Sequence, residues 1–389
     1  MSATADSAHL AARAGIGSVA PARPLPPFTD EYERLRLEMR AFVESELAPH
    51  AAEWEDARWF ADWVIPRVAE QGYVGLKFPK ELGGGDDELA AAVWAQELAR
   101  CGSGGVGAGI GAHTGIALPP VWKFGTPDQH QRYLAPGIRG EKVAALGITE
   151  PDAGSDVAGI KTRARRVEGG FLVNGSKMFI TNGVRADFIV TAVKTTEEGG
   201  HHGISFVIVD RGEGVSASKI EKLGWHASDT ALIAFDDVFV PEENLLGPEH
   251  EGFKLIMANF QWERVMMALG AVGAMEAVFE RTLAAVQARG RCSQATRHTL
   301  AEVALALESG RAITYNALRL HLAGANAVQE VTMAKLATQR AAYEAADACL
   351  DIHGPEPGIE RAVRDLRLGP IGGGTDEIMR EILGKTLGL

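Results

Sequence analysis

Cysteine is scarce in this chain of 389 residues, since only Cys101, Cys292 and Cys349 are present. No two of them have the spacing of a metal-binding pair, and an odd number does not suit a disulfide framework. Such frameworks form in oxidising compartments, whereas thiols stay reduced in the cytoplasm. We therefore expect a cytoplasmic protein without disulfide bonds and without a metal centre.

Long apolar runs are also missing, since no stretch approaches the roughly 20 apolar residues that span a bilayer. The first 27 residues are rich in alanine and contain scattered proline, but they lack the apolar core of a signal peptide. We expect residues 1–27 to form a disordered leader. We also expect no membrane partner.

Positive charge is in deficit, because 39 Lys and Arg residues stand against 51 Asp and Glu, a net charge of -12. An acidic surface is repelled by the phosphate backbone, so we expect no nucleic-acid partner. An anionic cofactor in a locally basic pocket stays compatible with this balance. The hydrophobic fraction of 46% is ordinary for a globular protein with sizeable cores.

The chain contains three blocks that differ in residue types and in the spacing of their apolar residues. Residues 28–140 show apolar residues at three- and four-residue steps, which predicts helices. Residues 141–245 are short β-branched segments between turns, which predicts antiparallel strands of a barrel or sandwich. Residues 246–389 return to long, Ala-rich helical segments. Segregated blocks indicate an α+β fold rather than a doubly wound sheet.

Two short motifs carry little functional information. The "GAGIGA" of residues 107–112 resembles a dinucleotide fingerprint, but no βαβ unit surrounds it, and helix packing through small residues explains it better. His201 and His202 are adjacent, so they do not suit one metal ion, and we expect them at a solvated hairpin tip.

A longer motif, "ALGITEPDAGSDVAGIKT" at residues 145–162, is more specific. A strand breaks at Pro151 into a turn rich in Gly, Ser and Asp. Backbone amides and hydroxyls in such a turn suit ring edges and phosphates. A β-hairpin without a binding role would explain the polar turn, but it would not explain the whole motif of residues 145–162.

Several motifs in the correct order resemble the acyl-CoA dehydrogenase family: "ITEPDAGSD", "NGSKMFITNG", "KLGWHASDT", "FDDVFVPEENLLG" and "GTDEIMREI". The resemblance runs from about residue 29 to residue 385. It implies a helical N-terminal domain, a central β domain and a C-terminal four-helix bundle. It also implies FAD as cofactor and removal of hydrogen from Cα and Cβ of an acyl thioester.

The resemblance assigns site residues by position. The residues expected at the cofactor are Leu146, Ile148, Thr149, Ser155, Phe179, Ile180, Thr181, Arg289, Thr375, Asp376 and Glu377. Those expected at the substrate are Ser155, Gln261, Arg264, Gly373 and Gly374.

The catalytic base is the decisive assignment. Many family members place a carboxylate where this chain has Gly373, and glycine cannot act as a base. Isovaleryl-CoA and long-chain dehydrogenases carry the glutamate on a helix before an arginine, and "NFQWERVMM" contains that pair as Glu263 and Arg264. The resemblance therefore implies Glu263 as base and the Gly373 amide as a donor to the thioester oxygen. Apolar neighbours of Glu263 should raise its pKa. The small Gly372–Gly373 pair suggests a branched, bulky or long acyl group.

Two segments depart from the family pattern. "RGRCS" keeps Arg289 but has Cys292 and Ser293 for the usual Phe-Gly, and "DIHGPEPG" has Asp351 for a glutamine. Both belong to the region expected to hold the adenine end of FAD. A changed interface between copies, or a heteromeric partner, is compatible with these changes.

The leading interpretation is an FAD-dependent acyl-CoA dehydrogenase that passes electrons to an electron-transfer flavoprotein and forms a homo-oligomer, a dimer or a tetramer. An oxidase or flavin monooxygenase that uses O2 on the same fold stays open. So does a non-catalytic structural subunit of a heteromeric dehydrogenase. The sequence does not distinguish coenzyme A from a carrier protein.

Overall fold

The computed structural model describes residues 24–196 and 200–389, so most of the predicted leader at residues 1–27 lies outside the described part. The chain forms two compact units, each assembled from separate segments. Among the described residues, unit 1 contains residues 24–50, 88–104 and 264–389, and unit 2 contains residues 51–87, 105–196 and 200–263. The division into segments 28–140, 141–245 and 246–389 stays a prediction.

Unit 2 combines short helices with the strands of the chain. Its helices are α3 (Ala51–Ala57), α4 (Val64–Glu70), α6 (Gly105 onward, within Gly104–Gly111), α7 (Leu118–Phe124), α8 (Pro127–Gln129) and α9 (Ala135–Ile138). Its strands are β1 (Ala144–Gly147), β2 (Arg163–Val167), β3 (Gly170–Ile180), β4 (Phe188–Lys194), β5 (Ile204–Asp210), β6 (Val215–Lys219), β7 (Ala231–Pro241) and β8 (Leu245–Leu246).

The strands form one open, mixed sheet in the order β6-β7-β3-β2-β4-β5-β8, and β1 pairs with β4 in parallel. The expectation of a purely antiparallel barrel or sandwich was therefore wrong in detail, although the α+β class is confirmed. Hairpins make β2–β3 and β4–β5 antiparallel. β1 instead reaches β4 after a long excursion through β2 and β3, and such a crossover gives parallel pairing.

Both faces of the sheet are covered, as the burial of β4 shows. Phe188, Val190 and Ala192 enter a core with residues of α7 and α9. Ile189 and Val193 enter a second core with β3, β5 and β7. Alternate strand residues point to opposite faces, so a strand buried on both sides reads as a continuous apolar run.

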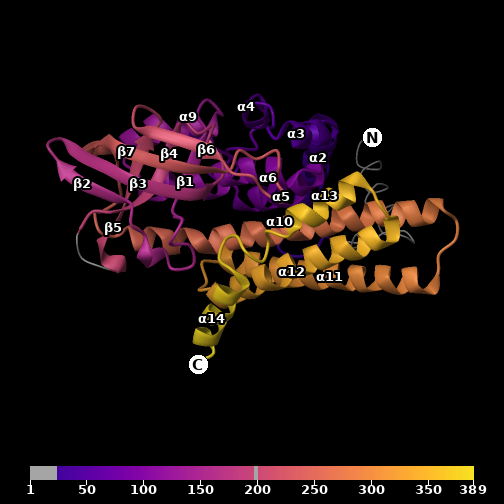
Figure 1. The fold of residues 1–389 in the computed structure, drawn as a ribbon. Helices are drawn as coiled ribbons and strands as arrows, with labels where there is room; N and C mark the ends of the chain where they lie inside the picture. The colour runs from indigo at the N-terminus through magenta and orange to yellow at the C-terminus, as the bar shows by residue number, and fades with distance from the viewer. Residues whose placement is uncertain (1–23, 197–199) are drawn as a thin grey trace. The chain divides into compact units, whose positions relative to one another are not determined.

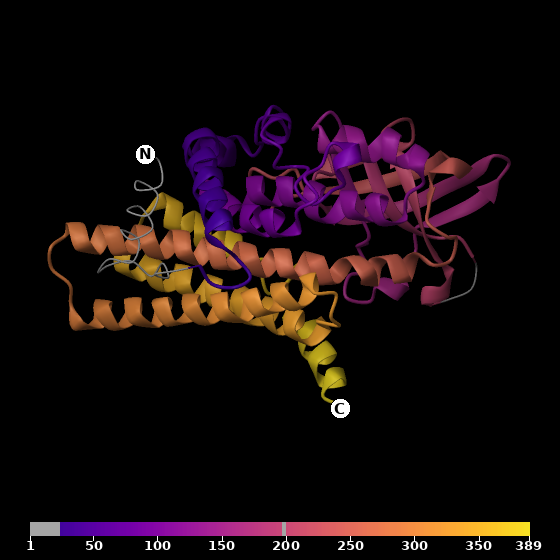
Figure 2. The same ribbon diagram turned by 180° about the vertical axis from the view of Figure 1, so that it is seen from behind.

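Unit 1 is a helical bundle. Figures 1 and 2 show α11 and α12 side by side, with the C-terminal part of α10 along them. The helices with residues in this unit are α2 (Asp30–Phe42), α5 (Glu88–Leu98), α10 (Gly252–Ala288), α11 (Gln294–Leu322), α12 (Val328–His353), α13 (Pro357–Leu366) and α14 (Asp376–Thr386). The boundary with unit 2 falls inside α10, between Glu263 and Arg264.

Candidate active site

The loop between β1 and β2, which carries the motif of residues 145–162, is held by a buried ion pair. Lys177 of β3 donates to the Glu150 carboxylate at 2.7 Å and to the Ile148 carbonyl at 3.1 Å. The same carboxylate accepts from the backbone amides of Lys161 and Thr162 at 2.5 and 2.9 Å. One carboxylate thus ties both ends of the loop to β3.

In the Lys177–Glu150 pair, burial and the charge of the partner shift the pKa of each residue in opposite directions. Burial lowers the pKa of Lys177 to about 8. Burial would raise the pKa of Glu150, but Lys177 and the hydrogen bonds hold that pKa below its usual value. The carboxylate is therefore ionised at neutral pH, which keeps the hydrogen bonds that it accepts from Lys177, Lys161 and Thr162. Neither residue was assigned a role from the sequence, although a lysine inside the apolar strand "SKMFI" is an available signal.

Phe179 has a backbone and an exposure that set it apart. Its φ is 61°, which is unusual for an aromatic residue, and its side chain is 60% exposed. The register of β3 against β7 shifts between Lys177 and Ile180, so an extra residue bulges there. The bulge turns the Phe179 ring outward. An exposed ring in a strained backbone is a candidate ligand contact.

The other residues expected at the flavin ring lie nearby in the same unit. Met178 of β3 donates its backbone amide to the Thr149 carbonyl at 2.8 Å, which joins the two motifs. Leu146 and Ile148 are half-buried against the core. Thr149 and Thr181 are half-buried, and Ser155 is exposed. Ile180 is buried in the sheet core, so only its backbone can face a ligand.

Glu263 lies on the part of α10 that belongs to unit 2, and it is half-buried. The adjacent Trp262 is buried, and the Lys77 ammonium lies 4.0 Å from the centre of its ring. Cation–π contacts that are shielded from water stabilise by about 2 kcal/mol. Asn259, one turn earlier, donates to the Ile116 carbonyl at 3.3 Å. Gln261 is half-buried. These contacts fix the turn of α10 that carries the glutamate.

The glycine loop before α14 belongs to unit 1. Gly373 and Gly374 have φ of 61° and 95°. Lys335 of α12 donates to the Gly374 carbonyl at 2.6 Å. A Cβ at Gly374 would lie 2.7 Å from the Met379 methyl, which would have to move, and the positive φ would strain any larger residue at this position. Arg264 is buried.

The start of α14 follows this loop. The Thr375 hydroxyl accepts from the Ile378 amide at 3.3 Å and caps the helix. Asp376 is buried and lies near Arg340 and Arg380, whereas Glu377 is exposed. Hydrogen bonds at the helix start hold the pKa of Glu377 below its usual value. Two carboxylates at a helix N-terminus suit the helix dipole.

The two altered segments meet in unit 1. The Arg289 guanidinium donates to the carbonyls of Ile352 and His353 at 3.0 and 3.5 Å. It therefore ties the end of α10 to the end of α12. Asp351 is exposed and Cys292 is half-buried.

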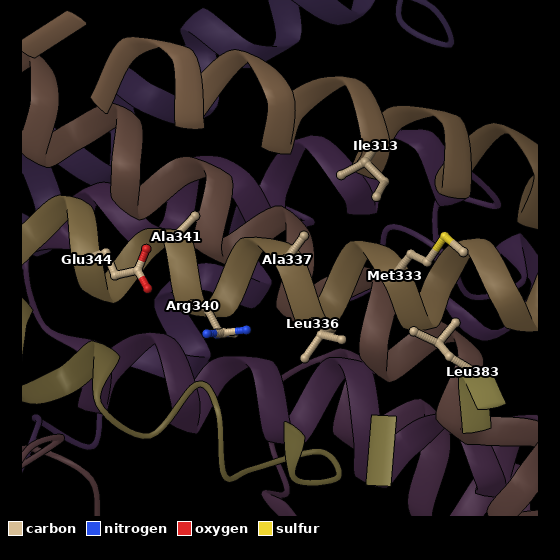
Figure 3. A pocket seen from close by; sticks show the side chains of 8 residues that line it. All are labelled: Ile313, Met333, Leu336, Ala337, Arg340, Ala341, Glu344 and Leu383. Atoms are coloured by element: carbon tan, nitrogen blue, oxygen red, sulfur yellow. The ribbon is translucent and has the colours of Figure 1, made fainter. Parts of the chain in front are cut away.

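A groove of about 500 Å³ lies elsewhere on unit 1, and none of the expected site residues lines it. Figure 3 shows Arg340 and Glu344 among mainly apolar side chains of α11, α12 and α14. In residues 24–196 and 200–389, no three His, Cys, Asp or Glu side chains form a group that could hold a metal ion. Within those ranges, no helix has the length and apolar character to cross a bilayer.

Three family models cover nearly the whole chain. Residues 29–141, 145–238 and 250–388 match the N-terminal, middle and C-terminal domains of acyl-CoA dehydrogenase. The chain belongs to the acyl-CoA dehydrogenase family. Membership assigns it to the oxidoreductases that dehydrogenate acyl-CoA substrates.

Relatives of this acyl-CoA dehydrogenase family member include long-chain and isovaleryl-CoA dehydrogenases, the two subfamilies that the position of Glu263 in the sequence indicated. The long-chain specific acyl-CoA dehydrogenase of Mus musculus is 34% identical, over 92% of this chain and 87% of its own. The isovaleryl-CoA dehydrogenase of Solanum tuberosum is 35% identical, over 92% and 91%. The crystal structure of acyl-CoA dehydrogenase from Geobacillus kaustophilus is 34% identical, covers 94% of this chain and 100% of its own, and has a TM-score of 0.89.

Proposed function

We propose that this protein catalyses FAD-dependent α,β-dehydrogenation of an acyl thioester, with Glu263 as the base. The observation that carries the proposal is the position of Glu263 beside the buried Trp262, while glycine stands at position 373. Glu263 takes the α-proton, and the Gly373 amide donates to the thioester oxygen as enolate character builds. Arg264 and Gln261 accompany the base as substrate contacts.

The residues of unit 2 fit the flat ring of a flavin. The exposed Phe179 ring supplies a stacking surface, and Thr181 two residues later supplies a hydroxyl donor. Thr149, whose carbonyl accepts from the Met178 amide, and Ser155 of the same loop supply further hydroxyl donors. When bound, FAD supplies the acceptor for the hydride from Cβ. The role of this chain is to hold the ring edge, to place the base and to polarise the thioester.

Binding of the adenine end of FAD depends on the two altered segments, residues 289–293 and 351–358. We propose that Arg289 lies at this end, as the family pattern implies, and that Thr375, Asp376 and Glu377 meet the cofactor at the start of α14. The substrate is proposed to be branched, bulky or long, because Gly372 and Gly373 leave space in the acyl pocket. An electron-transfer flavoprotein is proposed as acceptor, and a homo-oligomer as the assembly.

Substitution of the base tests the proposal. Glu263→Gln keeps the shape of the side chain but removes its basicity, so we expect turnover to fall by about 10³-fold or more while the flavin spectrum is unchanged. The purified protein is titrated with a panel of acyl-CoA thioesters, and bleaching of the flavin band is followed. Unchanged turnover in the variant would reject Glu263 as base.

The same titration separates the alternatives. Reoxidation in air without an added acceptor would favour an oxidase or monooxygenase. A purified protein that contains no flavin and binds none when FAD is added would favour a structural subunit.

A further inference from the structure

Lys335 is a buried lysine inside the helical bundle of unit 1. It lies on α12 between Ala334 and Leu336, and its side chain is 0% exposed. A buried ammonium group is costly unless it is hydrogen-bonded. Lys335 directs its amine to the Gly374 carbonyl at 2.6 Å, a short, charge-assisted contact. The buried face of α12 therefore contributes a polar anchor to the glycine loop.

The loop needs anchors because its glycines are conformationally free. Gly373 and Gly374 both have positive φ, and glycine adopts this and other regions with similar ease. On the N-terminal side, the Gly372 amide donates to the Leu368 carbonyl at 3.0 Å. On the C-terminal side, the Gly374 carbonyl accepts from Lys335. Gly373 therefore lies between two fixed points.

We propose that Lys335 is a positioning residue for the reaction: it fixes the Gly374 carbonyl and thereby the direction of the Gly373 amide. This inference rests on the proposed function, in which that amide donates to the thioester oxygen. A donor stabilises developing charge only if its direction is set before the reaction. Without Lys335, the dihedral angles of Gly373 and Gly374 lose one of the constraints on their C-terminal side, and the Gly373 amide samples unproductive directions more often.

The alternative is that the contact of Lys335 with the Gly374 carbonyl only stabilises the helical bundle. A ligand that ionises when it binds distinguishes this structural role from positioning of the Gly373 amide. A 3-oxoacyl-CoA matched in chain length to the best substrate forms an enolate whose ultraviolet absorbance is measured against pH. The enolate oxygen is stabilised by the same donors as the transition state, so the pKa of the bound ligand reports their alignment.

Lys335→Met removes the donor and keeps a flexible, unbranched side chain. In the flavin-loaded variant we expect the pKa of the bound 3-oxoacyl-CoA to rise by about one unit, a tenfold weaker preference for the enolate. We also expect kcat to fall by about tenfold or more with KM within about twofold of wild type, because the loss concerns the transition state.

Thr338→Ala is the matched control, because Thr338 is buried on the same helix and its hydroxyl donates to the Ala334 carbonyl. It should lower thermal stability but leave the ligand pKa unchanged. The inference is wrong if Lys335→Met leaves that pKa at the wild-type value, or if Thr338→Ala raises it equally. If Lys335→Met does not fold, Lys335→Leu, which also lacks a donor, is titrated with the same criterion. Unchanged turnover of Glu263→Gln would reject Glu263 as the base of the proposed function. The pKa of the bound ligand in Lys335→Met would still decide whether Lys335 positions the Gly373 amide.

Discussion

Phe179 and Lys177 are two residues apart in β3, yet one is exposed and the other is buried. In a regular strand, residues at this spacing lie on the same face. The bulge between Lys177 and Ile180 separates them, so one short segment supplies both a buried cation and an exposed ring. The strained backbone at Phe179 is thus part of the bulge that lets Lys177 point into the core and the Phe179 ring point outward.

Phe179→Ala tests whether this ring contacts the cofactor. The side chain is mostly exposed, so its loss should leave thermal stability nearly unchanged. Aromatic stacking contributes about 1 kcal/mol, so we expect FAD to bind about fivefold to tenfold more weakly, measured by flavin fluorescence during titration of the apoprotein. Phe239→Ala is the control, because Phe239 is also exposed, at 53%, on β7 of the same unit. Equal loss in both variants would contradict the assignment.

At the scale of elements, the loop between β1 and β2 keeps its shape through Glu150. Glu150→Gln would leave the Lys177 ammonium buried without a counter-charge, and removal of one partner of a buried pair costs about 3 kcal/mol. We expect a lower midpoint in urea and a lower flavin content, because one of the two loop amides loses its acceptor oxygen and faces an NH2 group instead.

Asp152→Asn is the comparison for this loop. Its ion pair with Lys161, at 2.9 Å, is exposed, and such pairs contribute little because water and salt screen them. We expect the variant to resemble the wild type in both measurements. A Glu150→Gln protein that was equally stable and equally yellow would show that the ion pair does not shape the loop.

The sequence predicted elements and family better than it predicted contacts. Helical period, turn residues and ordered motifs were enough for the α+β class, because these signals are local. The parallel pairing of β1 with β4 was missed, because strand pairing depends on the path of the chain between them. The buried lysines Lys177 and Lys335 were missed for a related reason: their partners are 27 and 39 residues away. Ile180 lies in the sheet core, and its place at the cofactor stays a prediction.

At the scale of the whole chain, unit 1 is joined by a buried cluster of charges from four helical segments. Two carboxylates, Glu97 and Glu276, are surrounded by arginines at 2.7–3.2 Å: Arg36, Arg40, Arg100 and Arg311. These residues are up to 275 positions apart, since they run from 36 to 311. The cluster therefore joins α2, the end of α5, α10 and α11 within one unit.

The cluster should make the fold sensitive to acid. Burial alone would raise the pKa of Glu97 and Glu276, but the arginines outweigh it and hold both values below the usual 4.5. A carboxyl group with a depressed pKa in the folded state stabilises fully above its unfolded pKa, and this contribution is lost as the pH falls through the folded value. We therefore expect the free energy of unfolding to be level near neutrality and to decrease below about pH 4.5.

Glu276→Gln isolates this contribution, since the amide cannot ionise and leaves Arg40, Arg100 and Arg311 short of a counter-charge. We expect about 3 kcal/mol less stability at pH 7 and a smaller further loss between pH 5 and pH 3, both from urea unfolding curves. Glu141→Gln serves as control, because its pair with Arg139 is exposed and should matter little at either pH. If Glu276→Gln kept the wild-type slope against pH, the acid sensitivity would have to come from other carboxylates, because the removed group no longer takes up a proton.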